Sequence, residues 1–362
     1  MSGIRNSPSL PPDERLRQVG RLRRFLARPE TGAVAGALII FVFFSLVAGD
    51  KGFLAQRGIR SWMEVSAQLG IIGIGATLLM IGGQFDLSVG SMIAAAGMLF
   101  LLPVVVYGWP IWLALVVVLL FAAGVGLVNG TLVNRTGLPS FIVTLAFLFI
   151  LRGLTLGITR AVTGSTQVSV RAFIGTVDGV VTGADARAVL QDTFVGRLFS
   201  FEWLGMPASV WWWLGLTIVA AYLLLRTPFG NWIFAVGGNA EAARNSGVPV
   251  DFVRIVLFMG TALCASILAL LQVFDLGSAD VTRGTLKEFE AIIVAVIGGT
   301  LLTGGYGTVV GAVFGALIFG MTSQGIFIAR WNTDWFRVFL GALLLVAVIF
   351  NTFIRKHATE AS

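Results

Sequence analysis

The chain reads NWIFAVGGNAEAARNSGVPVDFVRI from Asn231 to Ile255, a polar, small-residue passage between two long apolar segments. Its middle, Asn239 to Gly247, is predicted to form one short helix that the final glycine ends. This helix, which we call the docking helix, carries Glu241 and Arg244 three residues apart beside three alanines. An exposed helix that enters the groove of a partner protein needs this combination of small apolar contacts and flanking charge.

The docking helix admits two interpretations. In the first, a soluble partner binds it and moves a membrane protein through it, with Gly237-Gly238 as the hinge ahead of it. In the second, the segment is a solvated cytoplasmic loop without a special role. The residues predicted to couple the chain to such a partner are Asn239, Ala240, Glu241, Ala242, Ala243, Arg244, Asn245 and Gly247.

The composition is that of an integral membrane protein. Hydrophobic residues make up 57% of the chain and charged residues 12%, with a mean hydropathy of +0.91, whereas roughly a quarter of the residues in soluble domains are charged. Runs of about 20 apolar residues, long enough to cross a bilayer as helices, recur along the chain. The 45 glycines and the near absence of apolar–polar alternation favour helices over a β-barrel. The predicted fold class is therefore an all-α polytopic membrane protein.

The sequence predicts no catalytic residue, cofactor or metal site. Cys264 is the one cysteine and His357 the one histidine, so neither a disulfide framework nor a metal site built from these residues is expected. The sequence contains no nucleotide-binding Gly-x-x-x-x-Gly-Lys-Ser/Thr loop, no His-Glu-x-x-His pair and no Gly-x-Ser-x-Gly elbow. The chain is therefore expected to be no enzyme and to hydrolyse no ATP itself. The net charge of +7 does not indicate nucleic-acid binding, because seven arginines precede residue 30 beside the first apolar run.

The apolar runs predict about ten transmembrane helices, with both ends of the chain in the cytoplasm. Seven arginines before the first span and three basic residues in the loop after it orient its N-terminal end inward. A cleaved signal sequence is the alternative for this span, because Val47-Ala48-Gly49 suits a signal peptidase. The predicted spans are residues 32–49, 62–83, 88–107, 111–133, 141–158, 209–226, 255–277, 291–303, 308–328 and 336–354.

These spans define a transmembrane domain, residues 32–354, between a basic cytoplasmic tail and a short C-terminal one. The two tails are residues 1–31 and 355–362. Within the transmembrane domain, residues 159–208 are predicted to be a long periplasmic segment. Residues 231–254 are predicted to be a cytoplasmic coupling loop that contains the docking helix.

Two glycine-rich breaks interrupt the apolar runs in a similar way. Ile81 to Ser91 and Ile297 to Gly311 each read as an apolar run, a glycine pair, a polar break and a helix of small residues. Both breaks follow an inward-running span, which predicts two parallel pseudo-repeats, and matched broken helices point to a transport pathway. The residues predicted to form the gate or translocation path are Asp86, Ser88, Gly90, Ser91, Gly298, Gly299, Gly304 and Gly305.

Asp86 also admits two interpretations. Asp86 and Ser88 can accept hydrogen bonds from free backbone N–H groups where the next helix starts, which is a helix-capping role. Alternatively, an acid near the membrane faces a cavity or a partner and helps to set a gate. At the start of another span, Glu64 and Gln68 lie one turn apart and either line a polar cavity or sit at the interface.

Four motifs, in order, carry a resemblance to a known family. They are GGQFDLSVGS at residues 82–91, LPSFIVTL at 138–145, GGNAEAARNSG at 237–247, and IGGT with TGGYGT at 297–300 and 303–308. Over residues 35 to 355 the chain resembles the membrane permease of bacterial ATP-binding cassette sugar importers, in the ribose, xylose and galactose branch. It departs from the usual pattern at Gln84-Phe85, where the family has a smaller aliphatic residue, and in its longer outer segment.

The resemblance implies a subunit of the bacterial inner membrane that works as a homodimer. A separate cytoplasmic ATPase would drive it and a periplasmic sugar-binding protein would supply the monosaccharide. The docking helix would be the coupling helix on which the ATPase binds, and the sugar would pass between the two permease subunits. The alternative from another class is an ion-coupled secondary transporter of a small polar solute, which the matched broken segments also permit.

Overall fold

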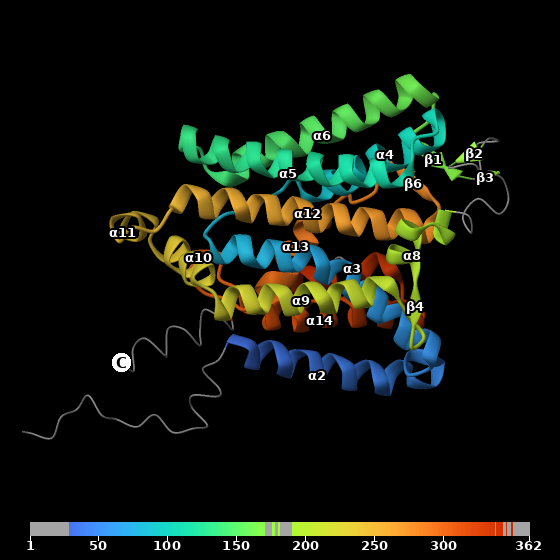
Figure 1. Cartoon of the computed structure of the whole chain (residues 1–362). Coiled ribbons are helices and arrows are strands. Elements are labelled where there is room, and N and C mark those ends of the chain that lie inside the picture. The colour runs from blue at the N-terminus through green and yellow to red at the C-terminus, as the bar shows by residue number, and fades with distance from the viewer. Residues whose placement is uncertain are drawn as a thin grey trace, which may run out of the picture.

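Helices make up almost all of the structure, a computed structural model that describes residues 29–170, 176–177, 180–181, 190–336, 338–342, 345 and 349. They lie side by side and form one bundle (Figure 1). Within the described residues, eight helices are long and apolar enough to cross a membrane, which confirms the all-α polytopic fold class. These are α2 (Pro29–Ala48), α3 (Gln56–Ile81), α4 (Val89–Tyr107), α5 (Ile111–Thr136), α6 (Ser140–Thr163), α9 (Ala208–Arg226), α12 (Val250–Leu276) and α14 (Val309–Ile328).

Most of the shorter elements lie at the two ends of the bundle (Figure 1). One end, which we call the docking end, carries α10 (Pro228–Gly238) and α11 (Ala240–Asn245) beside the start of α2. The opposite end, the strand end, carries three two-stranded antiparallel sheets, β1–β6, β2–β3 and β4–β5. Its elements are η2 (Gly49–Phe53), β1 (Gln167–Ser169), β2 (Thr176–Val177), β3 (Val180–Val181), α8 (Phe194–Ser200), β4 (Glu202–Trp203), β5 (Met206–Pro207) and β6 (Ser278–Asp280).

The prediction of ten spans is not confirmed. Instead of the return span 291–303, the structure has α13 (Lys287–Ile297), whose 11 residues extend roughly 16 Å, about half the thickness of the hydrocarbon layer. This helix ends six residues early because Gly299 has a φ of 90°, which residues other than glycine rarely adopt. A segment without helix leads from Gly298 to Thr308. The predicted span 336–354 lies mostly outside the described residues, as do the two predicted tails.

Two predicted loops contain more regular structure than expected. α6 continues to Thr163, so the predicted periplasmic segment 159–208 starts inside a helix, and its described part includes β1, the β2–β3 pair, α8 and the β4–β5 hairpin. The coupling loop 231–254 contains the end of α10, all of α11 and the first residues of α12. The coupling loop therefore places short helices at the docking end, and the predicted periplasmic segment places short strands and a helix at the strand end.

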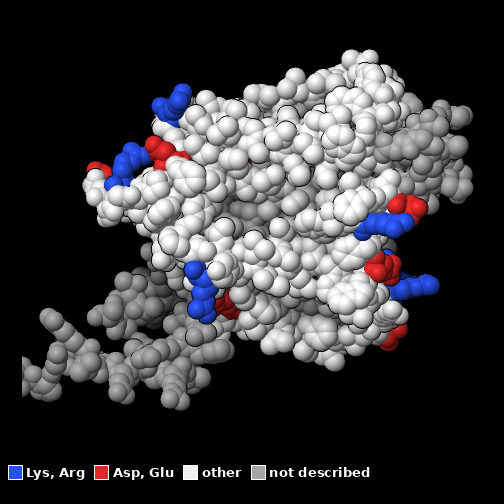
Figure 2. Space-filling view, viewed as in Figure 1, with Lys and Arg blue, Asp and Glu red and all other residues white. Residues whose placement is uncertain are grey.

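Charged side chains lie at the two ends of the bundle on the face drawn in Figure 2, and an uncharged band separates them. Exposed side chains on the spans include large apolar ones such as Leu120 on α5, Phe149 on α6 and Ile218 on α9. Apolar side chains around the waist of a helix bundle match the hydrocarbon of a bilayer, where helices satisfy their own backbone hydrogen bonds. The helices therefore cross the membrane, and the docking end and the strand end lie on opposite sides of it.

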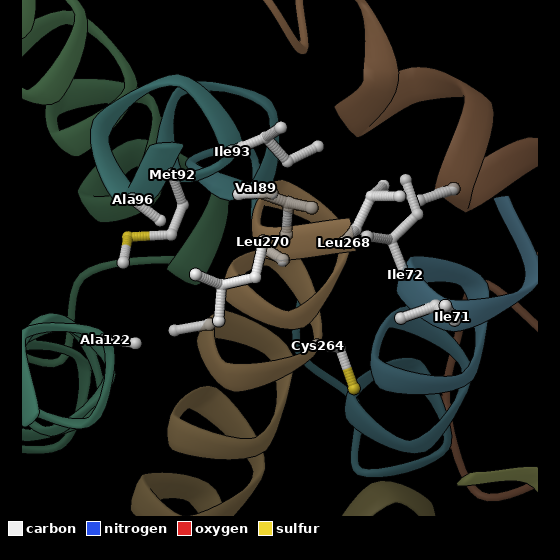
Figure 3. Close-up of a cluster of buried hydrophobic side chains, with 14 of the residues drawn as sticks. Ile71, Ile72, Val89, Met92, Ile93, Ala96, Ala122, Cys264, Leu268 and Leu270 are labelled. Atoms are coloured by element: carbon white, nitrogen blue, oxygen red, sulfur yellow. The ribbon is translucent and has the colours of Figure 1, made fainter. Parts of the chain in front are cut away.

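α12 lies at the centre of the bundle, between α3 on one side and α4 and α5 on the other (Figure 3). Two glycines of α5 allow α12 to approach closely. A methyl group on Gly126 would lie 2.6 Å from the nitrogen of Met259, and one on Gly130 would lie 2.7 Å from Cα of Ile255. Side chains such as Leu268 of α12 and Ile72 of α3 are buried in this core. The four central helices thus form a densely packed scaffold between the two ends.

Candidate functional site

The docking helix is present as α11, although its six helical residues are fewer than predicted. The Asn239 side chain caps it, since Oδ1 accepts a hydrogen bond from the N–H of Ala242 at 2.9 Å. At the other end Gly247 has a φ of 83°, and the N–H of Val248 bonds to the Ala243 carbonyl at 3.0 Å. A left-handed glycine with such a bond is a common helix ending.

One face of α11 packs on the bundle and the rest is exposed. Ala243 is buried and Ala240 packs against the core, whereas Glu241, Ala242 and Asn245 are exposed. In the part of the chain that the structure describes, the Glu241 carboxylate has neither an ion pair nor a hydrogen bond. This carboxylate therefore remains available to a partner protein at the docking end.

Arg244, in contrast, is used inside the chain. Its Nη2 lies 2.6 Å from Oδ1 of Asp251 at the start of α12. The Asp251 carbonyl accepts a hydrogen bond from Nδ2 of Asn134 at the end of α5, at 2.9 Å, and Asn134 Oδ1 accepts one from Arg254 at 3.5 Å. These contacts tether α11 to two of the central helices.

Directly ahead of α11, three glycine pairs meet backbone to backbone. We call this contact the glycine junction; it consists of Gly82-Gly83 after α3, Gly237-Gly238 at the end of α10, and Gly304-Gly305 between α13 and α14. The N–H of Gly305 donates to the carbonyl of Ile81 at 2.8 Å. A methyl group on Gly237 would overlap that carbonyl oxygen and lie 2.6 Å from the nitrogen of Gly305. The junction thus joins the hinge of the docking helix directly to both helix breaks.

The two breaks start with the same backbone geometry. The N–H groups of Gly82, Gly83 and Gln84 bond to carbonyls four, three and five residues back, and those of residues 298–300 repeat this pattern. The second glycine of each pair has a positive φ, 76° at Gly83 and 90° at Gly299. The similarity of the two breaks is therefore confirmed at these helix ends, whereas a repeat of two whole halves is not confirmed.

Asp86 lies in the break between α3 and α4, within a buried hydrogen-bonded network. Its Oδ1 accepts from the N–H of Ser88 at 2.8 Å and from the Ser88 hydroxyl at 2.5 Å. Nδ2 of Asn129 on α5 donates to the Ser88 hydroxyl at 3.3 Å. Within the described residues, Oδ2 of Asp86 and Oδ1 of Asn129 are buried and have no hydrogen-bond partner. Such groups are costly to bury and often mark a pathway in membrane proteins.

Side chains from α6 complete this break. Ser140 Oγ accepts the N–H of Phe85 and Thr144 Oγ1 accepts the N–H of Leu87, each at 3.0 Å. Asn129, Ser140 and Thr144 were not predicted as site residues. The spacing of Ser140 and Thr144, one helical turn apart at the start of a span, is a signal that would have placed both on one face. No comparable pattern in the sequence indicates Asn129.

The other predicted gate residues lie apart from the Asp86 network. Ser91 donates its hydroxyl hydrogen to the Leu148 carbonyl at 2.9 Å. Gly90 packs against the carbonyl of Gly284 and the buried carboxylate of Glu288, and Gly298 packs against the backbone of α14 at Gly311. Of the eight predicted gate residues, only Gly304 and Gly305 belong to the glycine junction.

The glycine junction connects the exposed, tethered helix α11 to two breaks in membrane helices, an arrangement that suits a protein that transmits motion across a membrane. A family model described as "Branched-chain amino acid transport system / permease component" matches residues 58–348. The chain belongs to this permease family. The permease is accordingly a transport subunit and a multi-pass membrane protein, and its resemblance to sugar-importer permeases is confirmed.

Curated relatives align with the permease over most of its length. The xylose transport system permease protein of Escherichia coli (strain K12) is 31% identical, covering 90% of this chain and 92% of the relative. The ribose import permease protein of the same strain is 30% identical, covering 90% and 96%. The xylose permease protein of Haemophilus influenzae is 29% identical, covering 88% and 94%. No solved structure matches the chain.

Proposed function

We propose that the permease carries a monosaccharide (a pentose, a hexose or a related polyol) across the bacterial inner membrane as part of an ATP-binding cassette importer. The observation that carries this proposal is the glycine junction, which joins the hinge of the docking helix to both broken helices. Movement of α11 by a partner would therefore reach α3, α13 and α14 without an intervening flexible side chain. The sugar assignment rests on the relatives, which include xylose and ribose permease proteins.

The energy source in this proposal is a separate cytoplasmic ATPase that binds α11. Glu241 supplies a free charge for that contact, Ala242 supplies a small apolar surface, and the Arg244–Asp251 pair holds the helix in place. The docking end and both chain termini would then lie in the cytoplasm. A periplasmic sugar-binding protein would bind the strand end, and two copies of the permease would form the passage between them.

Replacing Glu241 with alanine tests the ATPase contact. We expect Glu241→Ala to reduce sugar-stimulated ATP turnover of the reconstituted complex roughly 5- to 30-fold, the effect of 1–2 kcal/mol of lost docking free energy. Arg244→Ala should add to this loss, yet its exposed ion pair contributes only about 0–1 kcal/mol to folding. Membrane insertion and thermal stability should therefore remain close to wild type.

A matched control is Glu30→Ala, which removes a carboxylate from the first turn of α2 at the docking end, outside the docking helix. It should leave ATP turnover unchanged. If the Glu241→Ala, Arg244→Ala double variant turns over ATP at the wild-type rate, the docking helix has no part in coupling. If uptake in cells survives ATP depletion but stops with an uncoupler, an ion gradient drives the transport and the importer proposal is wrong.

A further inference from the structure

A small polar cavity lies at the strand end, on the side of the membrane opposite α11. Its volume is about 180 Å³, which equals roughly six water molecules at ~30 Å³ each. α3 and α12 form its inner walls, while α8, the β4–β5 hairpin and the start of α9 cover it. The cavity thus lies where two central helices meet the predicted periplasmic segment.

The inner wall presents two carboxylates and one amide. Glu64 and Gln68 of α3 line the cavity together with Asp275 of α12. Gln68 is held from two sides, because Nε2 of Gln272 donates to its Oε1 at 3.0 Å and its own Nε2 lies 3.4 Å from Oε1 of Glu64. Gln68 therefore presents its amide in a fixed position within the inner wall.

Ser209 supplies a second observation that points to a ligand. It is 5% exposed and lines the cavity from the first turn of α9. Within the described residues, its hydroxyl has no hydrogen-bond partner. A buried hydroxyl is costly to leave unpaired, since burial removes its bonds to water. The hydroxyl oxygen is itself closed to solvent, so a bound molecule with its own hydroxyl groups would satisfy Ser209 only after a small shift at the start of α9.

The outer wall combines an ion pair with an aromatic ring. Arg60 of α3 lies 2.5 Å from the Glu202 carboxylate on β4, which ties the hairpin to the bundle. Phe199 of α8 is buried and stacks on Trp212 and on Phe274, with ring centroids 5.1 and 5.7 Å apart. An apolar wall with a few fixed polar groups is the usual lining of a small-molecule site.

We propose that this cavity is a subsite for one monosaccharide, which the permease holds on the periplasmic side before translocation. This inference rests on the proposed function and adds a sugar-binding site within the permease subunit. Each hydroxyl of a sugar both donates and accepts hydrogen bonds, and the cavity offers acceptors at Glu64 and Asp275 and both kinds of group at Gln68 and Ser209. Its small volume favours a single sugar ring over a larger solute.

The test measures equilibrium binding of radiolabelled D-xylose and D-ribose to the purified full-length permease in lipid nanodiscs, without other subunits. Gln68→Leu removes an amide that can bond to the sugar and should weaken pentose binding roughly tenfold, and Ser209→Ala should weaken it about threefold. The matched control is Gln324→Leu, because Gln324 on α14 bonds to Ser61 at 2.8 Å and does not line the cavity. It should bind within twofold of wild type.

Two results would overturn the subsite: no binding of the pentoses or, in the same assay, of D-glucose and D-galactose; or sugar binding that is unchanged in both cavity variants. Binding of L-leucine in preference to every sugar would instead contradict the proposed substrate class. The two results that overturn the subsite do not depend on the ATPase, so they are separable from a failure of the proposed function. If Glu241→Ala still reduces sugar-stimulated ATP turnover while both cavity variants bind sugar as well as wild type does, the proposed function stands and the subsite is wrong. Thermal unfolding of each variant shows that a loss of binding does not reflect misfolding.

Discussion

Gly237→Ala is expected to reduce sugar uptake at least tenfold, whereas Gly238→Ala is expected to leave it close to wild type. The two glycines are adjacent at the end of α10, yet their surroundings differ. A methyl group on Gly237 would overlap the Ile81 carbonyl oxygen and crowd the nitrogen of Gly305, whereas one on Gly238 would meet nothing within 4 Å. Backbone atoms cannot rotate away as a side chain does, so in the Gly237→Ala variant the segments of the glycine junction must move apart. Overpacking of this kind typically costs 1–3 kcal/mol.

Helix propensity makes this comparison sharper. Alanine is favoured over glycine in a helix by roughly 1 kcal/mol, so propensity alone predicts that both substitutions stabilise the protein. Only the contacts of the junction give the two variants opposite outcomes. Uptake in cells and thermal unfolding of the solubilised protein measure the two effects. Wild-type uptake and stability in Gly237→Ala would show that the junction is not tightly packed.

Asp86→Leu is expected to destabilise the permease and to stop uptake, whereas Asp86→Asn is expected to be tolerated far better. Leucine leaves the N–H and the hydroxyl of the buried Ser88 without their acceptor, at about 1–3 kcal/mol for each unpaired donor. The asparagine carbonyl can accept both bonds, so the break before α4 keeps its geometry. The loss should appear both in thermal unfolding and in uptake.

Gln84→Leu serves as the control for this substitution. Gln84 is a buried polar residue of the same break, and its side chain makes no hydrogen bond among the described residues. Its replacement by leucine should therefore change neither stability nor uptake much. If Asp86→Asn is as damaging to uptake as Asp86→Leu while both proteins fold, the charge of Asp86 is required and capping is not its main role.

Hydropathy predicts where the chain crosses the membrane better than where helices begin. The first span was predicted at 32–49 and α2 covers Pro29–Ala48, because nearly all of this helix is apolar. α3, however, starts at Gln56 rather than at residue 62. Its first turns carry Arg57 and Arg60, which a search for apolar runs leaves out although they are helical. Polar helical turns at a membrane surface are therefore the part that such a search misses.

The docking helix and the glycine pairs were recognisable as local patterns, but their contact was not. Asn239 as a helix cap and Gly247 as a helix end follow from propensities of neighbouring residues. The meeting of Gly83, Gly237 and Gly304 depends on packing between segments that lie far apart in the sequence. The same holds for Asn129, which reaches Ser88 from another helix. Local sequence carries no signal for such pairs.

Cysteine labelling of intact cells tests the central claim, that α11 lies in the cytoplasm where a partner drives it. The native Cys264 is buried, so a membrane-impermeant maleimide should report only on introduced cysteines. Phe194→Cys, at a position 85% exposed at the strand end, should react in intact cells. In cells that express the permease without the ATPase, Ala242→Cys should react only after permeabilisation; labelling of Ala242→Cys from outside would contradict the account.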